Sequence, residues 1–333
     1  MNAPAMKPPK PPPKPPPAIR NWKPPVPTWT LADVSSGVQD VAKRLMLSGI
    51  EGIGKSTFGA NAPSPIFLGV EDGSLHLPVK RTPKISRWVD ALHAVDLLVK
   101  ETHPYKTCVV DTVDHLEPLL WDHICERDDE RSIESYGFGK GYTAALDEWR
   151  RFLRKLEALR AKDINVLLIA HTHLKNFKNP QGPDFDRYEL KLNIKAGGLL
   201  KEWCDAVLFA AYETWSVKED KKDKKGKGVS NGQRSIFTER TAAYDAKNRF
   251  GLPPQLPLSW DEFELAVQAG KPQDPTVLIE QINRQAALLD EGAQKKVAEA
   301  ISRASGDASK LTTLLHIVNN TPTAEQQSAE QEA

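Results

Sequence analysis

The sequence predicts an α/β fold in which a mainly parallel sheet is covered by helices on both faces. Between about residues 30 and 270, short apolar runs alternate with loops and helix-compatible segments, which is the pattern of a parallel sheet. A glycine-rich loop follows the first apolar run and leads into a helix-compatible segment. The charges nearly balance, with 45 Lys and Arg against 44 Asp and Glu, which excludes a wholly basic, histone-like protein. Any nucleic-acid site must therefore be local.

Residues 1–29 form a segment with its own composition. They contain 12 of the 26 prolines, five basic residues and no acidic residue. Because proline lacks a backbone N–H and fixes φ, we expect a disordered tail rather than a strand or a helix. Its composition is compatible with a docking peptide, a basic arm near nucleic acid, or a leader without a partner.

The core, residues 30–270, contains five apolar runs that are expected to form strands. They are Arg44–Ser48, Pro65–Val70, Thr107–Val110, Asn165–Ala170 and Ala206–Tyr212. Between the third and fourth runs, the segment Thr143–Lys162 places its apolar residues on one helical face. This segment is predicted to be a crossover helix, which parallel strands require.

A lysine-rich run, Lys218–Gly228, interrupts the last part of the core. The flanking segments Trp215–Val217 and Ser235–Thr238 are expected to pair as the arms of a hairpin. The tip of that hairpin is either a solvated loop or a contact to DNA.

Beyond the core, residues 271–320 are predicted to form a small helical module, and residues 321–333 a disordered acidic tail. The expected helices are Pro275–Arg303, with a break near Gly292, and Ala308–Val318. No apolar stretch approaches the roughly 18 residues of a membrane span. The N-terminus lacks the apolar segment of a secretory signal, and the three cysteines are scattered. We therefore expect a cytoplasmic protein without a disulfide framework.

The strongest functional signal is a G-x-x-x-x-G-K-S phosphate loop, whose expected binding residues are Gly49, Gly52, Gly54, Lys55, Ser56 and Thr57. The glycines let successive backbone N–H groups point at phosphate oxygens. Lys55 is expected to reach the β- and γ-phosphates, and Ser56 to offer its hydroxyl to Mg²⁺. ATP and Mg²⁺ are therefore the predicted cofactors.

Three further strand ends carry polar side chains that suit nucleotide hydrolysis. Asp111 ends the run TCVVD and is predicted to hold Mg²⁺ with Ser56, with helix capping as the alternative. Glu71, or else Asp72, follows the run IFLGV and is predicted to orient or deprotonate the attacking water, with a plain surface turn as the alternative. His171 follows NVLLIA; it is either a γ-phosphate sensor or a satisfied buried histidine.

The order of these motifs resembles a known family. The phosphate loop, GVEDG, CVVDT, the run VLLIAHTH and AKNRFGLP together look like a RecA-type core over roughly residues 40 to 262. The chain is most similar to the phage nucleotide-binding, RecA-like single-strand annealing proteins of the Sak group, AAA-type proteins encoded by bacteriophages. The resemblance implies a RecA-like P-loop NTPase core. In place of the large N-terminal helical domain of full RecA proteins, this chain has its Pro-rich tail.

The resemblance also implies roles for basic residues. Members of this family act across a subunit boundary through a K-N-K/R stretch near a proline, which Lys247 and Arg249 match. The alternative is a solvated basic turn. The family's DNA-binding loops follow the third and fourth strands, here around residues 132–142 and 175–195. The DNA-binding residues expected in the second loop are Lys175, Lys178, Arg187 and Lys191, interleaved with aromatic residues.

These observations support the hypothesis of an ATPase that acts on single-stranded DNA in annealing or homologous recombination. The expected partners are single-stranded DNA, further copies of the chain in a ring or filament with ATP at the subunit boundaries, and a single-strand-binding protein. Two alternatives stay open: an ATPase that loads or remodels a protein partner without touching DNA, and a scaffold that binds ATP but barely hydrolyses it. If the gene belongs to a phage, the expected location is the cytoplasm of the host bacterium.

Overall fold

The computed structural model describes residues 28–35, 39, 41–217, 227–270, 275–319 and 321–322. The chain divides into residues 1–38 and residues 39–333. In the first unit, a short 3₁₀ helix, η1 (Leu31–Asp33), begins where the Asp33 carboxylate accepts hydrogen bonds from the backbone N–H and hydroxyl of Thr30. Most of the predicted N-terminal tail, of the lysine-rich run and of the acidic tail lies outside the described residues.

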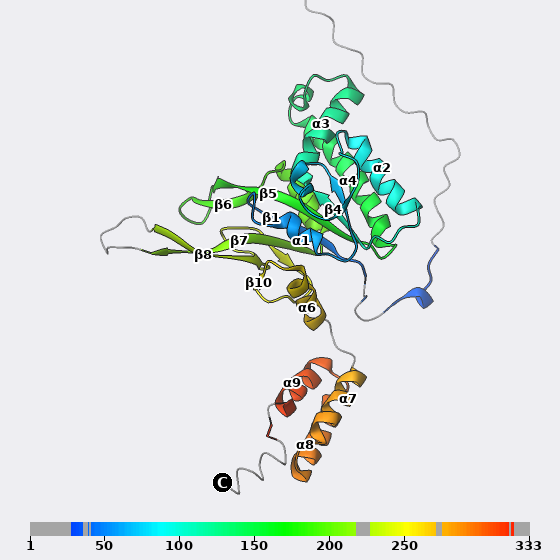
Figure 1. Ribbon diagram of the computed structural model, residues 1–333, viewed down its shortest axis with the longest axis vertical. Coiled ribbons are helices and arrows are strands. Elements are labelled where there is room, and N and C mark those ends of the chain that lie inside the picture. The colour runs from blue at the N-terminus through cyan, green and yellow to red at the C-terminus, as the bar shows by residue number, and fades with distance from the viewer. Residues whose placement is uncertain are drawn as a thin grey trace, which may run out of the picture. The chain divides into compact units, whose positions relative to one another are not determined.

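The second unit is built on a sheet with the strand order β10-β8-β7-β1-β5-β4-β2-β3, and the expected α/β fold with a mainly parallel sheet is confirmed (Figure 1). The parallel strands are β1 (Arg44–Gly49), β2 (Pro65–Gly69), β3 (Lys80–Arg81), β4 (Thr107–Asp111), β5 (Asn165–Phe177) and β7 (Ala206–Val217). Antiparallel strands complete the sheet: β6 (Phe185–Leu190), β8 (Lys227–Phe237), β9 (Lys247–Asn248) and β10 (Gln255–Pro257). All five predicted strands form.

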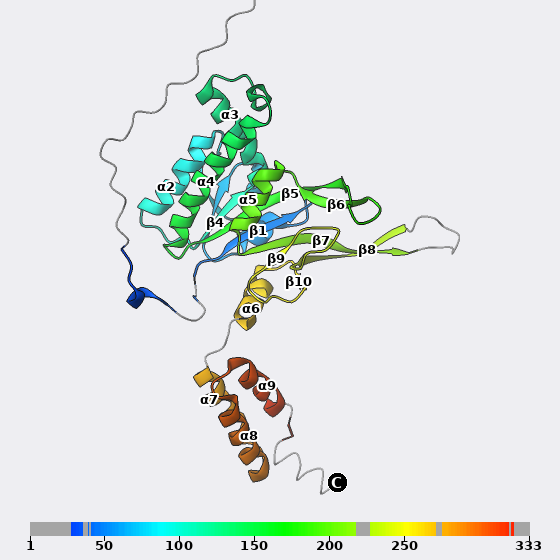
Figure 2. The ribbon, with the colours of Figure 1, turned by 180° about the vertical axis from the view of Figure 1, so that it is seen from behind.

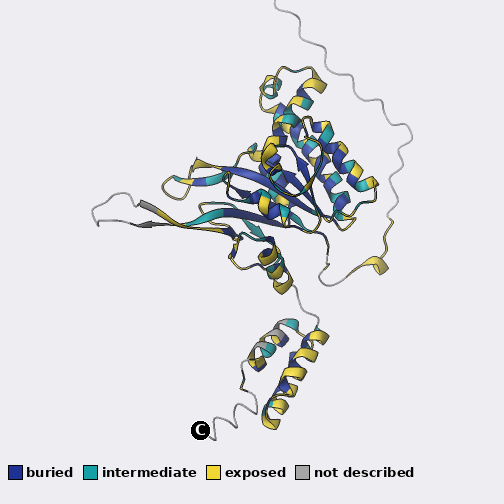
Figure 3. Ribbon diagram, viewed as in Figure 1, coloured by how far each residue is buried: buried dark blue, intermediate teal, exposed yellow. Residues whose placement is uncertain are grey.

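Helices cover both faces of this sheet (Figure 2). Along β1, side chains alternate between the two sides, so Met46 packs in one core while Leu45 and Leu47 pack in the other. The first core contains the helices α2 (Trp88–Lys100), α3 (Val113–Asp128), α4 (Lys140–Arg160) and α5 (Ile194–Trp203). The second core contains α1 (Lys55–Ala60) and α6 (Trp260–Gly270). Buried residues therefore fill the strands and the sheet-facing sides of the helices (Figure 3).

The predicted crossover helix corresponds to α4, which begins three residues earlier than expected and ends at Arg160. Its buried stripe includes Trp149 and Phe152. The ring of Trp88 on α2 lies 5.3 Å from each of these two rings, centroid to centroid. This aromatic contact fixes α2 and α4 over the same face of the sheet, because large rings bury much apolar area.

Two long hairpins extend from the body on the same side of the molecule (Figures 1 and 2). Strand β5 continues past His171 and pairs with β6, so the segment expected to be a DNA-binding loop is instead a hairpin followed by α5. Strands β7 and β8 form the second hairpin in a different register from the predicted one. Trp215 pairs with Val229, whereas Ser235 pairs with Ala211. The pairing is also irregular between Tyr212 and Thr214, where the register itself shifts.

The C-terminal residues form the helices α7 (Pro275–Ala286), α8 (Glu291–Ala304) and α9 (Ala308–Asn319), which share a core of their own. The break expected near Gly292 falls just before it. There Asp290 caps α8, since its carboxylate accepts a hydrogen bond of 2.9 Å from the backbone N–H of Ala293.

Gly49 at the end of β1 should be indispensable for packing. A Cβ at this position would lie 2.5 Å from the carbonyl oxygen of Ala210 on the neighbouring strand. Because that oxygen belongs to the central sheet, we expect Gly49→Ala to lower the free energy of unfolding by roughly 1–3 kcal/mol. The measurement is urea unfolding without nucleotide.

The matched control is Gly198→Ala on α5, where an added Cβ would meet no heavy atom within 4 Å. This change should leave stability unchanged or raise it by up to about 1 kcal/mol, because alanine favours the helix. Equal losses in both variants would contradict the packing argument.

Candidate nucleotide-binding site

The phosphate loop connects the end of β1 to the start of α1. Gly52 and Gly54 have φ values of 72° and 112°, in the region that glycine adopts without strain. The Lys55 ammonium lies inside the loop and donates hydrogen bonds to the carbonyl oxygens of Gly49 (3.1 Å) and Ile50 (2.8 Å). Burial lowers the pKa of Lys55 from its usual value. The two glycines therefore let the backbone of the loop wrap around the buried Lys55 ammonium.

Asp111 lies at the end of β4, beside the phosphate loop. Its Oδ2 accepts a hydrogen bond of 2.8 Å from the Ser56 hydroxyl, while its Oδ1 is buried without a hydrogen-bond partner among the described residues. The residue is 1% exposed, and burial raises the pKa of its carboxyl to about 6. A hydroxyl beside a carboxylate with a free oxygen is a donor set that suits Mg²⁺. Ser56 and Asp111 are thus the residues that would hold this ion.

A chain of carboxylates and imidazoles lies next to Asp111. The Glu71 carboxylate, directly after β2, is 3.0 Å from Nδ1 of His115. Asp114 accepts hydrogen bonds from the backbone N–H of His171 (2.9 Å) and contacts its ring Nδ1 (2.8 Å). Glu71, His115 and His171 offer ligand-type atoms within 4.8 Å of one another, a set of nitrogen and oxygen donors that could also accept a metal ion. The neighbouring His115 fixes where the Glu71 carboxylate points.

These groups line one cavity of about 650 Å³. It contains the phosphate loop, Glu71, Asp111 and His171, which are predicted site residues that come from separate strands. Asp114, His115 and Arg234 line it as well, although sequence reasoning did not select them. Asp114 and His115 follow Asp111 closely in the chain, so their sequence position could have indicated that they belong to the site. Arg234 lies on β8, and its position in the sequence gave no such indication.

Lys191, one of the four cations predicted to bind DNA, lines this cavity. Its ammonium forms an ion pair with the Glu51 carboxylate of the phosphate loop, which lowers the pKa of Glu51 to about 2. Its backbone N–H donates a hydrogen bond of 2.9 Å to the carbonyl oxygen of His171. Lys191 follows β6 directly. The end of the β5–β6 hairpin is therefore attached to the nucleotide site.

Arg187 also differs from the sequence-based expectation, because it is buried. Its guanidinium forms ion pairs with Glu189 (3.0 Å) and Asp245 (2.7 Å) and so faces the protein rather than solvent. Lys178 is exposed and paired with Asp184, and Lys175 is exposed. Of the four cations predicted to bind DNA, only these two lie on the open surface of the hairpin.

Lys247 and Arg249 lie at the opposite edge of the sheet, where β9 pairs with the first residues of β7. The Lys247 ammonium donates to three backbone carbonyl oxygens at the end of α5, those of Lys201, Glu202 and Cys204. It thus caps a helix. Arg249 has 57% of its side chain exposed and lies 3.7 Å from Asp205. The fold does not bring either cation to the cavity of its own chain.

A protein-family model described as an AAA domain matches residues 42–250, which include every residue of the nucleotide cavity. The chain belongs to this family. The AAA domain is thus a P-loop ATPase domain, and proteins with such domains generally bind ATP with Mg²⁺.

A solved structure of a KaiC-like protein from the archaeon Pyrococcus horikoshii OT3 is also similar, with 10% identity and a TM-score of 0.32. The alignment covers 61% of this chain and 81% of the archaeal one. No curated protein matches the chain. Among the described residues, none of the helices is both long and apolar enough to span a membrane.

The buried Asp111 should make stability depend on pH. Because its pKa is raised to about 6, the folded chain keeps a proton that the unfolded chain releases, and this contribution to stability is lost as the pH rises through about 6. Asp111→Asn stays neutral and should be more stable than the wild type by about 3 kcal/mol at pH 8. This difference should vanish below about pH 4.

The measurement is urea unfolding in EDTA without nucleotide at several pH values. Asp147→Asn, which changes a mostly exposed carboxylate, should show no such pH-dependent gain. A stability difference between Asp111→Asn and wild type that is the same at every pH would contradict the argument.

Proposed function

We propose that this protein hydrolyses ATP and couples the hydrolysis to binding of single-stranded DNA during annealing or homologous recombination. The observation that carries this proposal is the ion pair between Lys191 and Glu51, because it joins the β5–β6 hairpin directly to the phosphate loop. The same hairpin presents Lys175 and Lys178 to solvent, and exposed lysines can neutralise DNA phosphates. A strand bound by the hairpin would thus alter the contacts of the phosphate loop.

The residues of the cavity have distinct proposed roles. Lys55 meets the negative charge of the β- and γ-phosphates, and the backbone N–H groups of the loop orient them. When bound by Ser56 and Asp111, Mg²⁺ would offset phosphate charge. Glu71 accepts a hydrogen bond from the attacking water and takes its proton. His115 positions the Glu71 carboxylate, and His171 stays in place because Asp114 holds its ring and its backbone N–H.

We also propose that the chain acts as a head-to-tail homo-oligomer. Arg249 is exposed and lies at the edge of the sheet opposite to the phosphate loop, so it can reach only the nucleotide of another copy. An arginine supplied in this way stabilises charge on the transferred phosphoryl group. Lys247, which caps α5, would hold the backbone beside Arg249 in position.

The first prediction from this proposal concerns DNA stimulation. Single-stranded DNA should raise the ATPase rate, and the stimulation should weaken with salt because binding releases counterions. If the site neutralises about three phosphates, the apparent DNA affinity should fall about 20-fold over a fourfold rise in salt. The measurement is phosphate release at two salt concentrations, with Lys55→Ala as the inactive control. A hydrolysis rate that DNA never changes would favour a protein remodelling ATPase instead.

The second prediction concerns Glu71. Glu71→Gln keeps the shape of the side chain but removes the base, so ATP should bind normally while turnover falls at least about 100-fold. Asp72→Asn is the matched control, because Asp72 is exposed and paired with Lys84. Binding is measured with a fluorescent ATP analogue and turnover by phosphate release. Full turnover in Glu71→Gln with a loss in Asp72→Asn would move the role of base to Asp72.

A further inference from the structure

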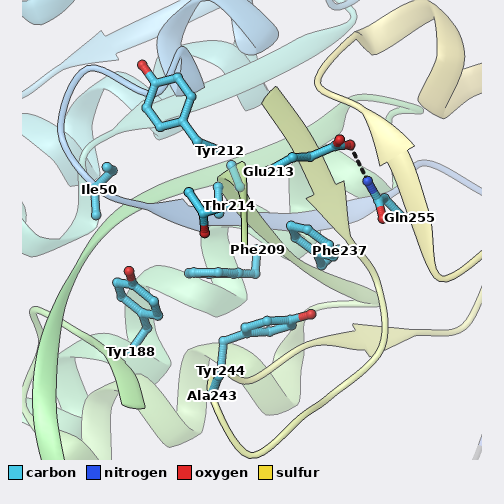
Figure 4. Close-up of a pocket in the computed structure, with 12 residues that line it drawn as sticks. Ile50, Tyr188, Phe209, Tyr212, Glu213, Thr214, Phe237, Ala243, Tyr244 and Gln255 are labelled. Atoms are coloured by element: carbon cyan, nitrogen blue, oxygen red, sulfur yellow. Dashed lines mark hydrogen bonds between the residues drawn. The ribbon is translucent and has the colours of Figure 1, made fainter. Parts of the chain in front are cut away.

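A second cavity of about 530 Å³ lies between the β5–β6 and β7–β8 hairpins (Figure 4). We call it the aromatic cavity; its wall includes Tyr188, Phe209, Tyr212, Phe237 and Tyr244. It shares no lining residue with the nucleotide cavity, yet Ile50 of the phosphate loop forms part of its wall. Both cavities therefore border the phosphate loop.

The rings form a layered surface. Phe209 is buried and lies at the base, with Tyr244 stacked on it at 4.4 Å between centroids and 14° between planes. Tyr188 of the first hairpin lies 5.1 Å from Phe209, and Phe237 of the second lies 5.5 Å from Tyr244. All of these rings except Phe209 are partly exposed. A flat ring that enters the cavity would thus meet aromatic surface from both hairpins.

The cavity also contains a carboxylate, that of Glu213, which can accept a further hydrogen bond. One oxygen of Glu213 accepts hydrogen bonds from the Ser235 hydroxyl (2.7 Å) and from the Gln255 amide, whereas among the described residues its other oxygen has only a long contact of 3.5 Å to Asn231. A purely apolar occupant would bury this second oxygen without a close donor, which is costly. An occupant with N–H groups on the edge of a flat ring would satisfy it.

Two cations lie near the cavity without lining it. The guanidinium of Arg234 lies over Tyr212, 5.8 Å from the ring centroid, and lines the nucleotide cavity. The exposed Lys175 pairs with Arg187, next in register to the pair that Tyr188 forms with Leu174. Within the part of the chain that the structure describes, neither cation has a carboxylate at ion-pair distance. Aromatic rings and a hydrogen-bond acceptor inside the cavity, together with the exposed Lys175 on the same hairpin as Tyr188, suit a nucleotide unit of a nucleic-acid strand.

We infer that the aromatic cavity binds an unpaired base of single-stranded DNA. This inference rests on the proposed function and names where the strand is held. The base stacks on the rings of the two hairpins and donates an amino or imino N–H to Glu213, while the exposed Lys175 of the first hairpin meets phosphates of the strand. Every base has a π-face and at least one such donor, so the site accepts all four bases.

The position of the cavity gives this binding a direct effect on the nucleotide site. A base in the cavity contacts Ile50, whose carbonyl oxygen accepts the hydrogen bond from Lys55. Tyr188 stands on the strand that leads to Lys191, the partner of Glu51. Occupancy of the cavity therefore acts on the phosphate loop through both Lys55 and Glu51, which explains how DNA would stimulate hydrolysis.

The test compares a labelled DNA oligonucleotide with an abasic oligonucleotide of the same length, which keeps the phosphates but lacks bases. The wild type should bind the normal strand about tenfold more tightly, since one stacked base contributes about 1–3 kcal/mol. Tyr244→Leu and Tyr188→Leu keep apolar bulk but lose the ring, and each should remove this preference. Tyr105→Leu, which removes a ring elsewhere in the molecule, is the matched control and should keep it.

A second measurement uses the wild type alone and so does not depend on the folding of a variant. A strand that carries 5-iodouracil is irradiated on the full-length protein, and the cross-linked peptides are identified by mass spectrometry. The expected cross-links fall on Tyr188, Tyr212 or Tyr244. Cross-links confined to other segments would overturn the inference.

The remaining outcomes separate the inference from the proposed function. Equal affinity for normal and abasic strands would overturn the base site while leaving DNA binding intact. Failure to bind either strand would overturn both. Tyrosine variants that lose affinity for ATP but not for DNA would assign the cavity to the adenine ring of the nucleotide. Loss of self-assembly with unchanged DNA binding would assign it to a second copy of the chain; both results would overturn the inference.

Discussion

Parallel pairing of β1 with β5 on one side and β7 on the other is the constraint on which the rest of the structure depends. It brings the carboxyl ends of three strands together, and each is followed by a functional segment. The phosphate loop leaves β1 between the two hairpins that continue from its neighbours. The close approach of Gly49 to the backbone of Ala210 fixes the point at which the phosphate loop leaves the sheet. Because the phosphate loop borders both the nucleotide site and the aromatic cavity, this contact helps to position both.

Charge is distributed unequally between the two edges of the sheet. At the amino edge, Arg44 and Asp205 form a two-point ion pair, with contacts of 2.6 and 3.1 Å, which satisfies both groups within the protein. At the carboxyl edge, Asp111 is buried with one oxygen unpartnered among the described residues, and its pKa is raised. Burial of an unsatisfied carboxylate costs stability. Such a cost is typical of a site that is complementary to a ligand rather than to the protein itself.

The two hairpins extend this site beyond the sheet. Several of their cross-strand pairs include polar residues, and each hairpin also contributes aromatic side chains to the aromatic cavity. The first hairpin places Lys191 beside the phosphate loop in the nucleotide cavity, and the second places Arg234 in that cavity. A ligand that draws the hairpins together would act on the nucleotide site from both sides. Under the proposed function, short contacts rather than a long path would couple the two cavities.

The parallel core and the residues that follow each core strand could be predicted from the amino-acid sequence. Buried strands read as continuous apolar runs, and the phosphate loop is a local motif, so neither needs knowledge of distant contacts. The same holds for Glu71, Asp111 and His171, since each follows its apolar run directly. The positions of Lys191, Arg187 and Lys247 could not be predicted from the sequence, because their partners come from segments far away in the chain. The sequence shows that a residue is positively charged but not which group it contacts in the folded chain. The pairing of strands far apart in the chain brings each cation beside its partner. The same pairing forms the aromatic cavity from segments that share no local sequence pattern.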